Sequence, residues 1–430
     1  MNPPEQDRHL EKAITRRHAV ALYVSSVLGS GVLVLPGLAA KIAGPASLAA
    51  WILLSLASYP FAYTFASLSS RKPESGGVYA FAKESFGVRA AAITGWLFAL
   101  WFITGAPAVV LVAASYLQYA FPLTRPEVYL IATVVTLGPF LINYAGIRFS
   151  NKVQVAVTAS ILVLLVAAVA ASIFSVKAGN FSPFLPHGYF PVGTAAALIF
   201  WSFLGYENVS NVAEEFRDPA RDFHRSITAS VVIIGTMYTA VAFVTVGTLA
   251  YDAGGSVAPF AAIFSNVLGS YGRAGTSILA IFIILGTANA YTTGMSRVIL
   301  ATARDGGLPR SIYHLNGRGV PDRSLILLFC ASMLVLAAYY LFDVDLEIAL
   351  MIPSGAAILV YIIGSSAGIK LLKERGIRRA LPWIALAMSV IVLPFVGIWI
   401  IGAVTVATAA IIYCFASGEF RNARTLDELT

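Results

Sequence analysis

The chain has 430 residues, of which 58% are hydrophobic and only 12% are charged, and its mean hydropathy is +0.80. Soluble globular proteins carry about 25% charged residues, so this composition excludes an ordinary soluble domain and indicates a polytopic membrane protein. The formal net charge of +8 at first suggests a nucleic-acid partner, but the basic residues are distributed as membrane topology requires, which argues against one.

Twelve apolar segments follow one another along the chain, most of them close to the roughly 20 residues that a membrane-spanning helix needs. The last two are the shortest. The expected spans are 19–43, 45–69, 90–119, 127–145, 152–175, 192–213, 226–250, 275–302, 324–342, 346–368, 381–396 and 398–416.

The basic residues fix an orientation for these spans. If the N-terminus is cytoplasmic, the inside segments hold 25 of the 29 Lys and Arg residues, and only Lys41, Arg125, Lys177 and Arg273 lie outside. This asymmetry is what the positive-inside rule predicts. We therefore expect cytoplasmic segments at 1–18 and 418–430, and contacts of the basic loops with anionic lipid.

The first span contains an interruption. Gly29-Ser30-Gly31, with Pro36 close behind, lies inside an apolar run that is otherwise long enough to cross a bilayer. Each glycine disfavours a helix interior by roughly 1 kcal/mol, so a break at mid-membrane depth is expected here. Broken backbone at that depth must face protein or a watery cavity, as in the substrate sites of secondary transporters.

The sixth span carries a matching interruption around Gly205, within Phe203-Leu204-Gly205-Tyr206-Glu207-Asn208. Spans 6 to 10 follow spans 1 to 5 at offsets of roughly 170 to 200 residues, with a break in the first helix of each half, which is typical of an inverted repeat. We expect a transport core at 19–368, built from repeats at 19–175 and 192–368, followed by two additional helices at 369–417.

The connection between spans 2 and 3 predicts a short helix. Pro73 and Gly76-Gly77 form a turn signal, and aromatic residues follow at 79, 81 and 86. We interpret this stretch as an amphipathic helix at the cytoplasmic face.

Three separated motifs now identify a family. The chain resembles the amino acid/polyamine/organocation (APC) superfamily of transporters over most of residues 19–370. The motifs are Gly29-Ser30-Gly31-Val32 with Pro36-Gly37, Pro73-Glu74-Ser75-Gly76-Gly77-Val78-Tyr79, and Phe200-Trp201-Ser202-Phe203-Leu204-Gly205-Tyr206-Glu207 running into Glu214-Glu215-Phe216-Arg217-Asp218-Pro219.

The resemblance implies an all-α, twelve-helix fold with five-plus-five inverted repeats (LeuT/APC-like) and broken helices 1 and 6. The stretch from Phe200 to Arg225 is most similar to bacterial exporters of methionine and branched-chain amino acids, which implies a multi-pass protein of the bacterial inner (plasma) membrane. Two residues depart from the family pattern. His224 stands where those relatives usually have proline, and Leu33 stands where much of the superfamily has phenylalanine.

A broken helix offers both halves of an amino acid site. The new N-terminus exposes N–H groups to the substrate carboxylate, and the new C-terminus exposes carbonyl oxygens to its ammonium group. The expected helix breaks are Gly29, Gly31 and Gly205. The carboxylate ligands are expected to be Ser30, Gly31 and Val32, and the ammonium ligands the backbone carbonyls of Ser26, Val27, Trp201 and Leu204.

Aromatic and polar residues of spans 3 and 6 are candidates for the wall of an apolar pocket, although such residues often face lipid or neighbouring helices. Glu207 is the one acid that the spans place deep in the membrane, where an unpaired carboxylate is costly, so it either carries a coupling proton or bonds to the unwound backbone. The candidate pocket residues are Trp101, Thr104, Trp201, Phe203 and Tyr206.

We expect a proton as the coupling ion, with sodium as the alternative. Four residues of span 8, Asn289, Thr292, Thr293 and Ser296, are candidates for a sodium site against span 1, although hydroxyl groups in membrane helices usually bond to their own backbone. Some proton-coupled relatives have a lysine inside span 5 that serves as a fixed cation. Span 5 of this chain has no such interior lysine, because Lys152 lies at its cytoplasmic end. No metal-ligand spacing occurs, and no organic cofactor is predicted.

Four functions compete. The first is export of neutral amino acids, namely methionine, leucine, isoleucine or valine. The second is transport of polyamines or other cationic amines, and import or exchange is the alternative direction. A membrane enzyme is disfavoured because the five histidines are scattered over termini and loops, and a channel or sensor on the same fold is the remaining alternative.

Overall fold

A computed structural model describes residues 10–252 and 259–416. This part of the chain is helical, and its β-type pairing consists of two isolated bridges, Ile14 with Phe216 and Ser75 with Val212. The α-helices are α1 (Arg16–Val27), α2 (Gly29–Ala43), α3 (Ser47–Ala57), α4 (Tyr59–Arg71), α5 (Val78–Phe86), α6 (Val88–Ala120), α7 (Arg125–Tyr144), α8 (Ile147–Ile173), α9 (Phe190–Phe200), α10 (Pro219–Gly247), α11 (Pro259–Arg304), α12 (Asp322–Leu341), α13 (Leu346–Met351), α14 (Ser354–Leu371), α15 (Leu381–Val392) and α16 (Ile400–Ala416).

Nine stretches of the described residues are long and apolar enough to cross a membrane. One of them, Arg16–Arg71, has 56 residues and contains α1 to α4, whereas α9 and α15 have 11 and 12 residues and fall below the length needed alone. The outer helices α7, α8 and α12 expose large apolar side chains such as Leu130, Val163 and Leu334, as surfaces in contact with lipid do. The chain is therefore an all-α, multi-pass membrane protein.

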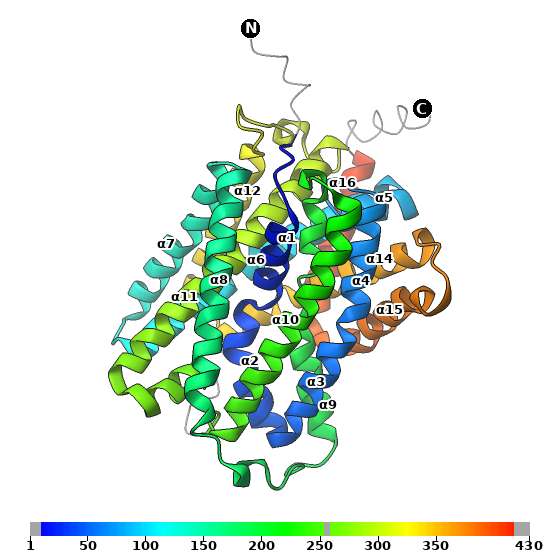
Figure 1. Cartoon of the computed structure of the whole chain (residues 1–430). Helices are drawn as coiled ribbons and strands as arrows, with labels where there is room; N and C mark the ends of the chain where they lie inside the picture. The colour runs from blue at the N-terminus through cyan, green and yellow to red at the C-terminus, as the bar shows by residue number, and fades with distance from the viewer. Residues whose placement is uncertain (1–9, 253–258, 417–430) are drawn as a thin grey trace.

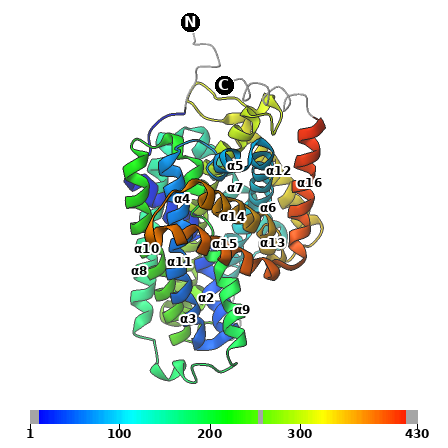
Figure 2. The same cartoon turned by 90° about the vertical axis from the view of Figure 1, so that its right-hand side faces the viewer.

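The two termini of the described chain lie at the same end of the bundle. Figure 1 shows α1 in the upper half and α2 in the lower half, and Figure 2 shows α2, α3 and α9 together at the bottom with α5 at the top. We call the end that holds residues 10–15, α5 and residues 305–321 the basic end, because the sequence places most Lys and Arg residues there.

Helix α5 occupies the position of the expected amphipathic helix but is largely buried. Val78, Tyr79 and Phe81 are each at most 1% exposed, because α5 packs between α6 and α14. The Tyr79 hydroxyl donates to Asp305 Oδ2 at 3.0 Å, and Lys83 Nζ lies 3.2 Å from the same oxygen. The helix is thus fixed to the protein, and in particular to the end of α11.

Helix α11 is longer than the expected span 275–302. It begins at Pro259 and contains Gly269 with φ of +57°, so two helical pieces meet at a kink there. Only glycine adopts this backbone conformation without strain. The apolar, membrane-length part runs from Ala274 to Arg304, close to the bounds that hydropathy predicts.

Candidate substrate site

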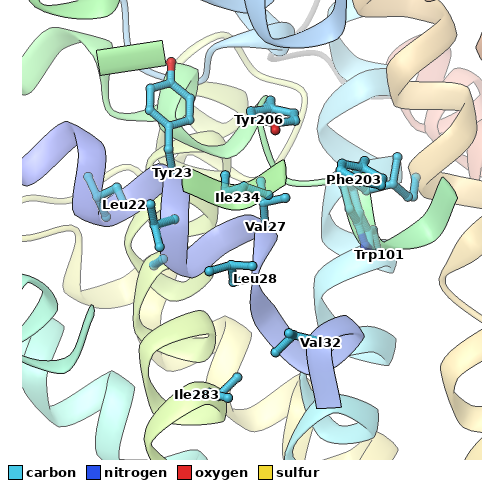
Figure 3. Close-up of a cluster of buried hydrophobic side chains, with 14 of the residues drawn as sticks. Leu22, Tyr23, Val27, Leu28, Val32, Trp101, Phe203, Tyr206, Ile234 and Ile283 are labelled. Atoms are coloured by element: carbon cyan, nitrogen blue, oxygen red, sulfur yellow. The ribbon is translucent and has the colours of Figure 1, made fainter. Parts of the chain in front are cut away.

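Helices α1 and α2 are separated by one residue, Leu28, whose ψ of 4° departs from helical geometry. The three residues Gly29, Ser30 and Gly31 then form the first turn of α2. The interruption therefore lies just before the glycines that predict it. Figure 3 shows Val27 and Leu28 at the bend, with Val32 further along α2.

The glycines of α2 allow close packing of other helices. A Cβ atom at Gly29 would lie 2.9 Å from Thr287 Cγ2 of α11, and one at Gly31 would lie 2.7 Å from Ser202 Oγ. Real Cβ atoms do not approach that closely, so any larger residue would push the neighbours away. Both glycines lie inside α2 and neither has a positive φ, so these positions need glycine for space.

The chain after α9 is irregular from Trp201 to Asp218. It contains three short 3₁₀ turns, Trp201–Phe203, Asn208–Asn211 and Ala213–Glu215. Gly205 has φ of +135°, and a Cβ atom there would lie 2.8 Å from the Ser26 carbonyl oxygen. Gly205 thus brings the interruption after α9 directly against the end of α1.

Hydrogen bonds join the two interruptions. The Tyr238 hydroxyl lies 2.5 Å from the Val27 carbonyl oxygen and 3.0 Å from that of Ser202. Asn208 Nδ2 donates to Ser26 Oγ at 3.0 Å and to the Ala290 carbonyl at 2.9 Å. Side chains thus replace the backbone partners that regular helices would supply.

A cavity of about 80 Å³ lies where these segments meet. Seven of the residues that the sequence predicts for the site line it: Ser26, Val27, Gly29, Ser30, Gly31, Trp101 and Leu204. Most of the wall is apolar, and none of the described side chains that line it is charged. The chemical character of the wall therefore suits a ligand with an apolar side chain.

Four predicted residues lie outside this cavity. Thr104 Oγ1 donates to the Leu100 carbonyl of its own helix at 2.7 Å, as hydroxyls in membrane helices often do. Phe203 packs against Trp51 and Tyr238, the Tyr206 hydroxyl lies 3.3 Å from Ser58 Oγ, and Val32 is fully buried away from the cavity. The side chain of Trp201 is outside the described part of the structure.

Sequence reasoning missed several wall residues. Thr287, Tyr291 and Met295 of α11 line the cavity at intervals of four residues, a helical spacing that could have pointed to one face. Ser202 also lines it and lies within the motif already noted, whereas Leu350 and Pro353 come from a distant part of the chain without a local signal.

The comparisons with known proteins decide the family. Residues 14–425 match the amino acid permease family model. The chain belongs to the amino acid permease family. This confirms the resemblance to the APC superfamily, and it establishes amino acid transport, rather than an enzymatic reaction, as the activity class.

Three relatives of this permease are bacterial proteins. It is 36% identical to the uncharacterized amino acid permease YecA of Bacillus subtilis (strain 168), over 86% of this chain and 87% of that protein. It is 30% identical to the L-methionine/branched-chain amino acid exporter YjeH of Escherichia coli (strain K12), over 90% of this chain and 92% of that protein. It is also 29% identical to the branched-chain amino acid permease BcaP of Bacillus subtilis, over 71% and 70%.

A larger vestibule adjoins the cavity of the permease. It has a volume of about 690 Å³ and shares Ser30, Gly31, Leu204 and Leu350 with the cavity. It continues along α2 to Lys41 and along α9 to Thr194, toward the end opposite the basic end. The vestibule therefore extends from the cavity toward the end of the permease opposite the basic end.

Between the cavity and the basic end, the permease is closed by buried contacts. Arg297 Nε and Nη2 lie 2.7 and 3.2 Å from the two carboxylate oxygens of Glu215, and the two side chains are 2% and 1% exposed. The Ile14 amide donates to the Glu215 carbonyl at 2.9 Å, and the Arg217 amide donates to the Ile14 carbonyl at 3.0 Å. Residues 10–15 thus form a strap across this end.

Glu207 lies behind the cavity and does not line it. Its Oε2 atom accepts a hydrogen bond from the Gly205 amide at 2.9 Å and another from the Tyr361 hydroxyl. The Gly205 amide also lies 2.7 Å from the Tyr361 oxygen. Because Glu207 joins the irregular segment to α14, these contacts favour the backbone-holding role over proton transfer.

The candidate cation ligands of α11 face α7 and α8. Asn289 Nδ2 donates to Gln154 Oε1 at 2.6 Å, and Thr293 Oγ1 donates to Asn143 Oδ1 at 2.7 Å. Ser296 Oγ accepts from Arg297 Nη1 at 2.9 Å, and Thr292 is buried nearby. Asn289, Thr293 and Ser296 are thus bonded to neighbouring protein groups, and the sodium site stays a prediction.

Proposed function

We propose that this permease is a secondary active transporter of neutral amino acids, with methionine and the branched-chain amino acids as substrates and export as its direction. The observation that carries the proposal is the small cavity between α1, α2 and the segment after α9, whose described wall is apolar and uncharged. A dication would require acidic groups in the wall, so this observation favours neutral amino acids over polyamines. Two relatives, an L-methionine/branched-chain amino acid exporter and a branched-chain amino acid permease, have names that agree with the proposed substrates.

The broken helix explains how the zwitterion is held. We assign its carboxylate to the first turn of α2, where the amides of Ser30 and Gly31 and the Ser30 hydroxyl lie at a positive dipole end. The third predicted ligand, Val32, does not line the cavity and is left out of this assignment. We assign its ammonium group to the carbonyls of Ser26, Val27, Trp201 and Leu204. The Val27 carbonyl already accepts from Tyr238, but a carbonyl oxygen has a second lone pair.

The wider architecture is part of the proposal. Twelve spans result if Arg16–Arg71 crosses twice and if α9 and α15 each complete a crossing with the chain beside them. Spans 1–5 and 6–10 then form inverted repeats at 19–175 and 192–368, and both termini are cytoplasmic. In this orientation the vestibule opens outward and the basic end is closed, which is one state of an alternating-access cycle.

Counterflow of labelled substrate tests this function. Proteoliposomes preloaded with unlabelled methionine, leucine, isoleucine or valine should take up labelled leucine faster than empty ones, because a carrier exchanges internal for external substrate through one alternating site. Preloaded spermidine or lysine should give no acceleration. Uptake that ignores the internal amino acid would indicate a channel, and acceleration by spermidine would instead support the polyamine alternative. Net efflux under opposed proton gradients then tests direction and proton coupling.

Replacing Glu207 distinguishes its two roles. Gln keeps an acceptor oxygen for the Gly205 amide and the Tyr361 hydroxyl but cannot exchange a proton, whereas Leu removes both. We expect Glu207→Gln to transport with the parent's pH dependence and Glu207→Leu to lose most transport. Uptake measured between pH 5 and 8 checks this. A pH-independent Glu207→Gln protein would identify Glu207 as the site of the coupling proton.

A further inference from the structure

A second groove lies at the basic end, away from the transport cavity. It has a volume of about 390 Å³, within the range of small-molecule sites. It shares no lining residue with the cavity or the vestibule. Its wall consists of Ser67, Ser70 and Arg71 of α4, His224 of α10, and residues 371–374 after α14.

The groove carries groups that bind a phosphate. Arg71 and Lys373 supply positive charge at its edge, and the Ser67 hydroxyl supplies a donor, whereas the Ser70 hydroxyl donates to the Ala220 carbonyl at 3.3 Å. Ser67 Oγ lies 3.4 Å from His224 Nε2, which holds α4 and α10 together at this point. The one acidic side chain in the wall is Glu374, and Arg71 is also paired with Glu84 at 2.7 Å.

Further basic residues follow the groove along the chain. Arg375, Arg378 and Arg379 come directly after its last lining residue, Glu374, and all three are exposed. Glu84 and Glu374 offset the charges of Arg71 and Lys373, so these three arginines supply the net attraction for anions.

The position of the groove is that of a membrane interface. Arg71 and Leu371 are the last residues of α4 and α14, and His224 lies in the second turn of α10. The chain beyond the groove exposes Ile377 by 82% and Trp383 by 57% beside the basic residues 375, 378 and 379. Tryptophan with exposed apolar and basic neighbours is typical of the headgroup region. Figure 1 and Figure 2 show α4, α14 and α15 side by side here.

We propose that this groove binds the phosphodiester of an anionic phospholipid. Arg71 and Lys373 flank the phosphate, Ser67 donates to it, and the exposed Arg378 adds positive charge from the chain that follows the groove. The acyl chains lie along the exposed apolar face of α15. Basic pockets between transmembrane helices bind anionic headgroups by this chemistry. A soluble anion would use the same cations, but it would make no use of the apolar surface that continues from the groove.

Lipid titration of the purified, delipidated full-length protein tests the proposal. In a nonionic detergent, dioleoyl-phosphatidylglycerol should raise the melting temperature in a saturable way and dioleoyl-phosphatidylcholine should not. The variant Lys373→Gln/Arg378→Gln should bind the anionic lipid about 25-fold more weakly, from about fivefold for each charge removed. Native mass spectrometry should show the loss of one retained phosphatidylglycerol.

The matched control removes two charges elsewhere on the surface. Lys152 and Arg318 are exposed and lie outside the groove, so Lys152→Gln/Arg318→Gln should keep the parent's lipid affinity. Equal weakening in both variants would mean a general charge effect and would overturn the proposal. Saturable stabilisation by glycerol 3-phosphate alone would identify a soluble anion site and would also overturn it, as would unchanged phosphatidylglycerol affinity in Lys373→Gln/Arg378→Gln.

Discussion

Substrate binding should disappear when Ser30 and Gly31 are both replaced by leucine. A Cβ atom at Gly31 would already lie 2.7 Å from Ser202 Oγ and 3.2 Å from the Tyr238 hydroxyl oxygen, and a full leucine side chain must enter the cavity. The Ser30 hydroxyl is lost at the same time. We expect at least a 100-fold loss of affinity, since several charge-assisted hydrogen bonds of about 1.5–3 kcal/mol each are removed.

The measurement is thermal stabilisation of purified variants by methionine or leucine, together with counterflow. Overpacking costs about 1–3 kcal/mol, so the variant is expected to fold with a lowered melting temperature. Gly31→Ala gives a milder second test of the same contact. Gly402 of α16 is exposed, and a Cβ atom there would meet nothing within 4 Å, so Gly402→Leu is the matched control and should bind normally. Parent-like uptake by Ser30→Leu/Gly31→Leu would disprove the broken-helix site.

Removing one partner of the Arg297–Glu215 pair should be the most damaging change at the basic end. The two side chains are almost fully buried, and Arg297 also donates to Ser296 Oγ at 2.9 Å. Arg297→Gln leaves an uncompensated carboxylate in the interior, and Glu215→Gln leaves an uncompensated guanidinium. A loss of about 3–5 kcal/mol in the free energy of unfolding is expected for either variant.

A double-mutant cycle separates this cost from a simple loss of packing. Arg297→Gln/Glu215→Gln removes both charges, so it should lose less stability than the sum of the two single effects. The exposed pair Arg71–Glu84 offers the control, and Arg71→Gln should change the free energy of unfolding by about 1 kcal/mol or less. Denaturation in detergent, followed by far-UV circular dichroism, measures all four proteins. Additive single effects would show that the pair is not coupled.

The glycines of the site were predictable because they are anomalies. Gly29, Gly31 and Gly205 interrupt apolar runs, and each proves to lie where a Cβ atom would collide with another segment. The motifs that carry the family resemblance contain the same glycines, so the backbone argument and the family resemblance point to the same positions. The family membership and the helical, membrane-spanning character were therefore accessible from sequence alone.

The walls of the site were less predictable, because helix faces are set by packing. Trp101 lines the cavity, whereas Thr104, three residues later, bonds to its own backbone. On α11, Thr287 and Tyr291 face the cavity, but Asn289 and Thr293, displaced by two residues, face α7 and α8. Two residues of a helix rotate a side chain by about 200°, so a polar residue on the right helix can point to the opposite side.

The strap at residues 10–15 limits which segments can separate from one another if the basic end opens. Because Ile14 exchanges two backbone hydrogen bonds with residues 215 and 217, the chain that leads into α1 and the chain that follows the second interruption are already tied together. The segment before α1 and residues 213–217 are therefore expected to move together. The buried Arg297–Glu215 pair joins these two segments to α11. Any opening at this end must therefore either break that pair or move α1, residues 213–217 and α11 together.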